Sequence, residues 1–396
     1  MGGNVDGKTG STRSAVVVGA GIGGLATAAA LVAQGWAVRV LERGPDLRAS
    51  GGGLGLTPNG MRALREIGVA DAVRARSVVQ DEGGVRVPGG RWVARHHLGF
   101  VERRYGESIR ALPRIELVRA LAAVLPPGTV RFGVRVEPVS AGGREAAAVV
   151  RVDGEDRDAD LLVGADGIRS VVRGLVHPGH PGVRDWGAVS WRAIVPAEGL
   201  APVAAETWGA GLRFSILPLP DGQVHFSALA RDRAARGADA PAALFGRWHD
   251  PIPQLLDRAA GGGYRDRIEE LARPLPTFVR GRTVLVGDAA HPMTPNVGSA
   301  NLALEDAVEL AAALGPAAGA DWTRSAAGLA DYDALRRPRT AAMSRTSRWM
   351  GRVAEASAPP LVLARTGGVW LGGLLPEVVS RRSMDRMVGW APPSAR

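Results

Sequence analysis

A β-branched run followed at once by spaced glycines constrains this chain more than any other feature. Residues 15–18 read AVVV, which is typical of a buried parallel strand, and the motif GAGIGG begins where that strand ends. Gly19 permits a tight turn, Gly21 lets backbone N–H groups approach a pyrophosphate, and Gly24 lets the next helix pack closely on the strand. We expect that helix over 25–34, with its N-terminus facing the phosphates.

The elements that follow complete a dinucleotide-binding unit. Gly35 is a suitable C-cap for the helix, and a second strand is predicted over 37–41. It ends in Glu42, at the distance after Gly24 where a carboxylate hydrogen-bonds ribose hydroxyls. An acid here favours an unphosphorylated ribose, so FAD or NAD is preferred to NADP. The glycines alone are a weak signal, but strand, glycines, helix, strand and acid in this order predict a bound dinucleotide.

Length and composition limit the remaining choices. A chain of 396 residues favours two interleaved domains, and the absence of cysteine excludes disulfides and thiolate metal sites; we expect no metal. Residues 1–14 are polar and lack the apolar core of a signal peptide, which predicts a disordered leader on a cytoplasmic protein. Residues 360–379 are apolar but interrupted by charges, prolines and glycines, so we expect burial against the protein and no membrane span.

The net charge of +10 raises the question of nucleic-acid binding. Lys8 is the only lysine, and the arginines are spread along the chain beside acids instead of forming a run. No module that combines aromatic and basic residues in the manner of RNA-binding domains is present. We therefore expect no nucleic-acid partner and assign part of the charge to an anionic cofactor.

A second segment also places a glycine and an acid after a strand. The strand expected over 160–163 precedes GADG at 164–167, and a short helix is expected over 168–175. Ligands of α/β sheets bind at such carboxyl ends of strands. Asp166 could bind a cofactor hydroxyl or cap the helix, and the sequence leaves both open.

A third segment is similar and richer. The strand expected over 282–286 leads into Gly287 and Asp288, and a helix is expected from Ser299 or Asn301. The positive N-terminus of that helix would stabilise a reduced, anionic flavin. We interpret His291 as a loop histidine bonded to backbone. The helical pattern places three acids on the water-facing side: Glu305, Asp306 and Glu309.

In combination, these segments resemble the class A flavoprotein monooxygenases, the group typified by p-hydroxybenzoate and salicylate hydroxylases. The resemblance extends over about residues 15–390 and rests on five motifs: GAGIGG with Glu42, GGLGLTPNGMRAL at 52–64, LPRIELVRAL at 112–121, GADGIRSVVR at 164–173 and GDAAHPMTPNVG at 287–298. It implies an α/β fold in which a Rossmann-like FAD-binding domain is interleaved with an antiparallel β-sheet substrate domain and followed by C-terminal helices.

The resemblance also assigns the cofactor-binding residues. It places Arg43 and Arg114 at the FAD phosphates and ribityl chain, Val136 at the adenine and Asp288 at the ribityl hydroxyls. Asp166 and Gly167 match a motif linked to both FAD and the nicotinamide nucleotide. The other implied contacts are Gly19, Ala20, Gly21, Ile22, Gly23, Gly24 and Glu42 at the ADP half, Gly55, and Pro295, Val297, Gly298 and Ser299 at the flavin ring.

One segment departs from the family pattern. Members commonly read Gly-Gln-Gly-x-Asn before the last helix of the FAD domain, whereas residues 298–301 read GSAN, which is one residue shorter and lacks a glycine. This backbone lies beside the flavin pyrimidine ring in the family. We therefore expect FAD binding to persist and the hydrogen bonds and mobility of the flavin to differ.

The substrate sheet is predicted between the second and third segments. Strands are expected over 187–195, 206–217 and 222–231, with a turn at 218–222. Alternation separates Leu212, Phe214 and Ile216 from Arg213 and Ser215, and Val224 and Phe226 from His225 and Ser227. The candidates for orienting a substrate are Arg192, Arg213, Phe214 and His225, with His225 also the candidate base. We place none of the tyrosines, Tyr105, Tyr264 and Tyr332, in this sheet.

The expected domain limits follow from these assignments. The FAD-binding domain comprises 15–80, 102–185 and 275–322, the substrate domain 81–101 and 186–274, and a helical region 323–396. In the last region Arg336, Arg337 and Arg339 are expected on a solvated or inter-domain face.

The resemblance implies a monooxygenase that uses O₂ and a flavin C4a-hydroperoxide to oxidise an aromatic, polycyclic or other electron-rich small molecule. NADH or NADPH would bind transiently, because only one dinucleotide fingerprint is present. We expect a monomer or homodimer. Two alternatives stay open: an FAD-dependent reductase or dehydrogenase of the same fold, and a non-catalytic flavoprotein that sequesters a ligand. A halogenase is disfavoured because Trp191 does not match the tryptophan motif of that class.

Overall fold

The AVVV run is an inner strand of a six-stranded, mainly parallel sheet. The computed structural model describes residues 13–47, 51–237, 240–317, 321–374 and 384–395, so most of the predicted leader lies outside it. The strands of this sheet, in spatial order, are Val279–Arg280 (β18), Thr283–Leu285 (β19), Leu161–Gly164 (β12), Ser14–Val18 (β1), Ala37–Leu41 (β2) and Val130–Arg131 (β8). Every residue of β12 is buried, as expected for a parallel strand covered on both faces.

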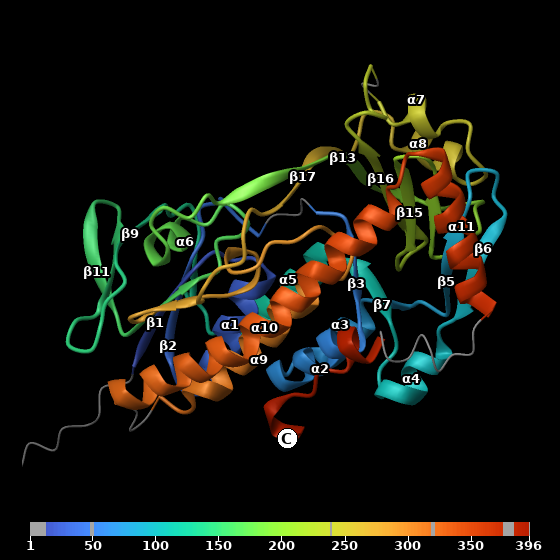
Figure 1. The fold of residues 1–396 in the computed structure, drawn as a ribbon. Helices are drawn as coiled ribbons and strands as arrows, with labels where there is room; N and C mark the ends of the chain where they lie inside the picture. The colour runs from blue at the N-terminus through green and yellow to red at the C-terminus, as the bar shows by residue number, and fades with distance from the viewer. Residues whose placement is uncertain (1–12, 48–50, 238–239, 318–320, 375–383, 396) are drawn as a thin grey trace, which may run out of the picture.

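Two helices that begin directly after glycine residues pack together beside this sheet. Ile22–Ala33 (α1) starts directly after the glycine turn and ends before Gly35, whose φ of 81° is left-handed. Ser299–Leu314 (α9) packs along α1. Figure 1 shows both helices at the same end of the molecule as β1 and β2.

A larger sheet occupies the other end of the elongated molecule (Figure 1). Its seven strands, in spatial order, are Tyr264–Leu271 (β17), Val183–Pro196 (β13), Gln223–Arg231 (β16), Leu212–Pro218 (β15), Ala205–Trp208 (β14), Glu82–Arg86 (β5) and Trp92–His97 (β6). All neighbours are antiparallel except β14 and β5. The predicted α/β class with a second, antiparallel sheet is therefore confirmed.

One face of the seven-stranded sheet packs on two short helices. Phe214, Ile216 and Phe226 lie in an apolar cluster with residues of Ala242–Phe245 (α7) and Ile252–Arg258 (α8). The predicted alternation along β15 and β16 therefore holds. The polar residues between these side chains face away from that cluster, toward the end of the molecule that holds the six-stranded sheet.

The remaining elements connect and cover the two large sheets. Two three-stranded sheets are formed by Glu155–Ala159 (β11), Ala148–Val152 (β10) and Val136–Ser140 (β9), and by Gly53–Leu56 (β3), Arg110–Pro113 (β7) and Val78–Val79 (β4). The other helices are Pro58–Ile67 (α2), Ala70–Ala75 (α3), Gly99–Tyr105 (α4), Arg114–Ala123 (α5), Val171–Val176 (α6), Trp322–Ala354 (α10) and Pro359–Leu374 (α11), with 3₁₀ turns at Gly287–Ala289 (η1) and Pro393–Ala395 (η2).

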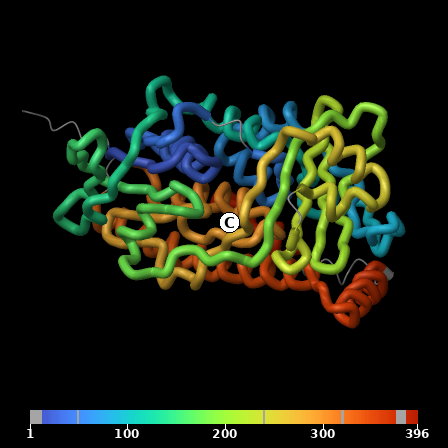
Figure 2. The backbone as a smooth tube through the Cα atoms, turned by 90° about the horizontal axis from the view of Figure 1, so that it is seen from above, coloured from blue at the N-terminus to red at the C-terminus, as the bar shows by residue number. Residues whose placement is uncertain are grey.

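The last long helices run along one side of the molecule. In Figure 1 α10 crosses in the foreground and leads to α11, and in the view from above both lie along the same edge (Figure 2). The expected burial of residues 360–379 is wrong for the part described, because Leu361, Leu363 and Leu371 of α11 are 59%, 76% and 58% exposed. Among the described helices, none is both long and apolar enough to cross a bilayer.

Candidate FAD and substrate site

The first two glycine turns meet through backbone contacts that exclude side chains. Gly19 has a φ of 106°, and a Cβ added to it would lie 2.5 Å from the carbonyl oxygen of Ala165. A Cβ on Gly24 would lie 1.9 Å from the carbonyl oxygen of Gly19. Both positions therefore need glycine, because real Cβ atoms do not approach backbone this closely. These contacts hold α1 and the second turn together at the ends of β1 and β12.

The third turn joins them from the side of α9. A Cβ on Gly23 would lie 3.5 Å from the Cβ of Ala303 and 3.9 Å from the Cα of Gly287. Gly287 begins η1 directly after β19 and has a φ of 57°. The three glycine-and-acid segments, although far apart in sequence, are thus assembled around one edge of the parallel sheet.

A cavity of about 710 Å³ opens at this edge. A Cβ added to Gly21 would have a guanidinium nitrogen of Arg114, 3.9 Å away, as its nearest neighbour, so the backbone at Gly21 is open to a ligand. Nine of the proposed cofactor residues line the cavity: Gly19, Ala20, Gly21, Glu42, Arg43, Arg114, Val136, Asp166 and Gly167. Its size suits a nucleotide moiety.

Glu42 shapes the wall of this cavity. One carboxylate oxygen accepts a hydrogen bond from the Ala20 N–H at 2.8 Å, and the other accepts one from the Gly44 N–H at 2.7 Å. The acid thus fixes both the glycine turn and the loop after β2. Carboxylate oxygens accept more than one hydrogen bond, so Glu42 keeps capacity for a ribose hydroxyl.

The two carboxylate oxygens of Asp166 correspond to the two functions that the sequence left open, capping a helix and binding a ligand hydroxyl. One of its carboxylate oxygens accepts from the N–H groups of Val171 and Val172, at 2.7 and 3.2 Å, and so caps α6. The other oxygen is buried and has no hydrogen-bond partner among the described residues. A buried acceptor without a donor is costly, and in the wall of a nucleotide-sized cavity it fits a ligand hydroxyl.

Asp288 is the second residue of η1. Its side chain is reached by solvent, yet the protein around it excludes enough water to raise the pKa of its carboxyl, against the opposing effects of His291, Arg114 and Arg173. Arg173 holds the turn in place, since it donates to the backbone carbonyl of Ala289 at 3.1 Å and to that of Ile168. Sequence reasoning placed Arg173 only on a helix and missed this link between the second and third segments.

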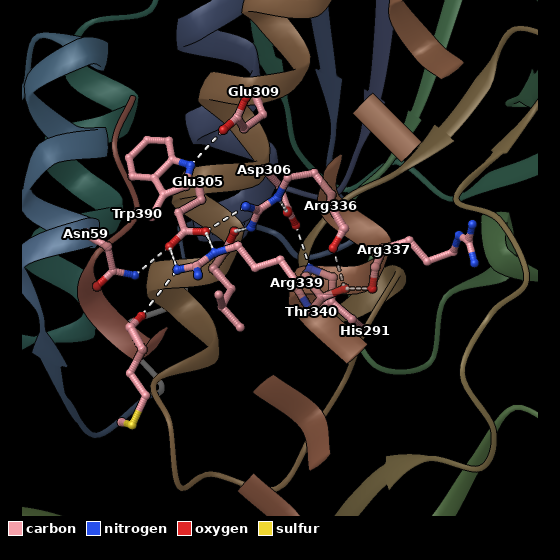
Figure 3. A network of polar contacts seen from close by, with 12 residues as sticks. Asn59, His291, Glu305, Asp306, Glu309, Arg336, Arg337, Arg339, Thr340 and Trp390 are labelled. Carbon is pink, nitrogen blue, oxygen red and sulfur yellow. Dashed lines mark hydrogen bonds and ion pairs between the residues drawn. The ribbon is translucent and has the colours of Figure 1, made fainter. Parts of the chain in front are cut away.

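A buried network of charges supports the third turn from α9 (Figure 3). One oxygen of Asp306 accepts from the N–H of Gly287 at 2.8 Å and from Nε2 of His291 at 2.6 Å, and the other accepts from Arg336 at 2.7 Å. Burial alone would raise the pKa of Asp306, but His291 and Arg336 more than offset it and hold that pKa well below its usual range. The sequence had suggested a backbone partner for the His291 side chain. Its partner is instead the carboxylate of Asp306.

The same network extends from α2 to the C-terminal segment. Glu305 accepts from Asn59 and Arg336, both at 2.7 Å, and from Arg339 at 2.6 Å, while Glu309 accepts from the indole of Trp390 at 2.7 Å. The water-facing assignment of Glu305, Asp306 and Glu309 is wrong, because all three are buried. Arg336 is also buried and not on a solvated face, whereas Arg337 is exposed.

The loop between η1 and α9 is tied down from three directions. Asn296 accepts from Arg213 of β15 at 2.5 Å, and its amide donates to the carbonyl of Ser347 in α10 at 2.9 Å. Gly298 caps α9 with a φ of 71°, and the side chain of Asn301 reaches the carbonyl of Gly55 at 3.1 Å. The loop is thus fixed by the side chain of Asn296, and the shortened segment that follows it by the side chain of Asn301. Arg213 therefore donates its hydrogen bond to this loop.

Two polar side chains of the sheet, those of His225 and Tyr264, contact Gly52. The Nδ1 of His225 contacts the carbonyl oxygen of Ala193 at 3.1 Å, and the imidazole lies directly against Gly52 and Gly53. Tyr264 accepts a hydrogen bond from the N–H of Gly52 at 2.9 Å. The guanidinium carbon of Arg192 is 5.9 Å from the centre of the Tyr264 ring.

Burial sets the protonation state of His225. It lowers the pKa of the imidazole to about 4, with a further contribution from the Arg192 guanidinium. A carbonyl oxygen can only accept, so Nδ1 of the neutral ring carries the hydrogen and Nε2 presents a lone pair. His225 therefore suits accepting a hydrogen bond better than taking a proton.

Two expectations about the sheet need correction. Phe214 is completely buried and packs on Phe226 and Phe245, on the face of the sheet that is covered by α7 and α8. It is therefore not placed to orient a substrate on the opposite, polar face. Tyr264 does belong to the sheet, as the first residue of β17 paired with Arg192. Residues 264–271 read YRDRIEEL, which does not alternate between apolar and polar side chains, so no local pattern placed Tyr264 in a strand. In the described residues no cluster of acids and histidines suited to a metal ion occurs.

Known proteins share this architecture and sequence. A family model described as "FAD binding domain" matches residues 12–210 and 267–347. Aurachin C monooxygenase/isomerase of Stigmatella aurantiaca is 35% identical over 339 residues, covering 83% of this chain and 86% of that protein. For 3-amino-4-hydroxybenzoate 2-monooxygenase of Streptomyces cremeus the identity is 35% over 362 residues, covering 86% of each.

A solved structure agrees with the fold. HpxO of Klebsiella pneumoniae, complexed with FAD and uric acid, has a TM-score of 0.78 and 28% identity, covering 90% of this chain and 92% of that one. The cavity at the glycine turns and the matches over most of the chain lead to the same conclusion. The chain belongs to the FAD-binding domain family, among the FAD-dependent aromatic hydroxylases and monooxygenases.

Proposed function

We propose that this protein uses NADH or NADPH and O₂ to hydroxylate a small aromatic or heteroaromatic compound held beside the loop at Gly52, on the polar face of the seven-stranded sheet. The observation that carries the proposal is the position of this face. Its side chains contact Gly52 and Asn296, which belong to the two loops beside the FAD-binding turns. When bound, FAD supplies the activation of O₂ after reduction by the nicotinamide.

The residues present fit FAD. The N-terminus of α1 and the open backbone at Gly21 suit the pyrophosphate, with Arg43 and Arg114 in the same cavity for its charge. Glu42 and the unpartnered oxygen of Asp166 are acceptors for hydroxyl groups. Among the remaining assignments we propose Val136 at the adenine, Asp288 at the ribityl chain, and Gly55, Pro295, Val297, Gly298 and Ser299 near the flavin ring.

Substrate orientation is proposed to depend on three side chains around Gly52. Nε2 of His225 would accept a hydrogen bond from a ring hydroxyl or N–H, because its lone pair is free at neutral pH. The hydroxyl of Tyr264 already accepts from Gly52 and keeps its own hydrogen to donate. Arg192 provides positive charge for an anionic substituent. This set suits small polar rings, the chemistry of uric acid and of aminohydroxybenzoates, which the names of related proteins give as ligand or substrate.

The decisive experiment separates oxidation from hydroxylation. The purified FAD-loaded protein is mixed with NADH or NADPH and a panel of aminohydroxybenzoates, purines and 4-quinolones, and product mass is measured under ¹⁸O₂. Incorporation of one ¹⁸O atom with stimulated NAD(P)H consumption is expected. Stimulated consumption that gives only H₂O₂ with every compound would favour a reductase, and no consumption at all would favour a ligand-binding flavoprotein.

Two finer points belong to the same proposal. The nicotinamide donor is taken to bind transiently at the surface, since the parallel sheet offers a single glycine-rich dinucleotide turn. A monomer or homodimer in the cytoplasm, where NAD(P)H is available, remains our prediction. Sedimentation velocity of the FAD-loaded protein tests the first, and cell fractionation tests the second.

A further inference from the structure

The last two helices carry the greatest apolar exposure of the described chain. Its four most exposed large hydrophobic side chains are Trp349 of α10 and Leu361, Leu363 and Leu371 of α11, at 65%, 59%, 76% and 58%. Trp370 is half exposed as well. Large apolar side chains exposed in number on neighbouring elements are typical of surfaces that contact a partner or a membrane.

The exposed charges on the C-terminal half of α10 have one sign, and α11 carries no acid. Arg345 and Arg352 are exposed and lie four residues before and three residues after Trp349, hence on the same side of α10. Between Asp333 and Glu377 the sequence contains one acid, Glu355, and it is buried against Trp186 and Arg213. The only charge of α11, Arg365, is buried and donates to the carbonyl of Ala354.

The two helices run along the same side of the molecule. In Figure 1 α10 and α11 both lie in the foreground, and in Figure 2 both lie along the corresponding edge. α11 packs against β6, so its opposite side faces outward. We define the α10–α11 surface as Arg345, Trp349, Arg352, Leu363, Trp370 and Leu371.

We propose that the α10–α11 surface docks the protein on an anionic lipid membrane. Leucine and tryptophan side chains enter the boundary between headgroups and acyl chains, while neighbouring arginines attract anionic headgroups. A second copy of the chain fits less well, because a twofold interface would place this basic surface against itself. No transmembrane insertion is involved, and the substrate face of the sheet is not part of the α10–α11 surface.

The test uses the full-length FAD-loaded protein and two kinds of vesicle. Co-sedimentation is measured with phosphatidylcholine alone and with phosphatidylcholine containing phosphatidylglycerol, at low and high salt. Binding to the anionic vesicles that weakens in salt is expected. Arg345→Gln with Arg352→Gln should lower the partition coefficient by about 25-fold, since each arginine near such a surface is worth roughly fivefold. Leu363→Ser with Trp370→Ser should lower it on the order of tenfold or more.

Matched controls come from other faces of the molecule. Arg76→Gln with Arg119→Gln removes two exposed arginines, and Val124→Ser with Val139→Ser removes two exposed apolar side chains; both should leave vesicle binding unchanged. Equal binding to neutral and anionic vesicles, or equal loss in the control variants, overturns the proposal. So does a dimer in sedimentation velocity that Leu363→Ser with Trp370→Ser dissociates while vesicles bind neither form.

Discussion

Removal of the Arg336 guanidinium tests the buried charge network most directly. Arg336→Met keeps the volume and the apolar stem but leaves Glu305 and Asp306 without a cation that contacts both, at 2.7 Å each. Breaking a buried ion pair on one side costs about 3–5 kcal/mol. Arg337→Met is the matched control, because Arg337 is the next residue, is exposed, and pairs with Asp333 only at 3.5 Å; its expected cost is below about 0.5 kcal/mol.

Thermal unfolding followed by circular dichroism measures the difference. For a chain of 396 residues, an unfolding entropy of about 2.1 cal/mol/K per residue converts 4 kcal/mol into a Tm lower by roughly 5 °C. The gap should narrow as the pH falls through roughly 4, because Asp306 in the variant then protonates and needs no counter-charge. If Arg336→Met and Arg337→Met unfold at the same temperature, the reasoning about the buried acids is refuted.

Three further predictions concern the site. Gly24→Ala should destabilise the fold by about 1–3 kcal/mol because its Cβ meets backbone at 1.9 Å, whereas Gly21→Ala should fold normally and bind FAD more weakly, as seen by flavin fluorescence titration. The free energy of unfolding should fall by up to about 1.4 kcal/mol per pH unit as the pH is lowered from 6.5 to 4, because the folded pKa of His225, about 4, lies below the unfolded one. In His225→Gln this pH dependence should be absent, and urea unfolding at several pH values checks this. Arg213→Met and Asn296→Ala should each lower kcat, and the double variant should lose less than the two single losses combined, since the two side chains share one hydrogen bond.

The sequence predicted elements well where local pattern and backbone sterics decide. The strand at 15–18, the glycine turn and the following helix depend on neighbours in sequence, and their limits in the structure differ by a few residues at most. The alternation along β15 and β16 also identified which side chains share a face, because one face had to be buried.

Prediction failed where a partner distant in sequence reverses a local preference. Glu305 and Asp306 have helical spacing typical of a wet face, yet arginines about one helix further along the chain neutralise them inside the protein. No periodicity argument contains that partner. Phe214 was wrongly chosen as a substrate-orienting residue for a related reason. The pattern separates the two faces of a strand but does not say which face meets the loops at Gly52 and Asn296.

The order of synthesis gives the buried network a further consequence. α9 leaves the ribosome with Glu305 and Asp306 already in place, about thirty residues before Arg336 and Arg339 and eighty before Trp390. Until those residues arrive, packing α9 against α1 would bury uncompensated carboxylates, which is unfavourable. The stable packing of α9 on α1 therefore depends on arginines that are synthesised about thirty residues after it.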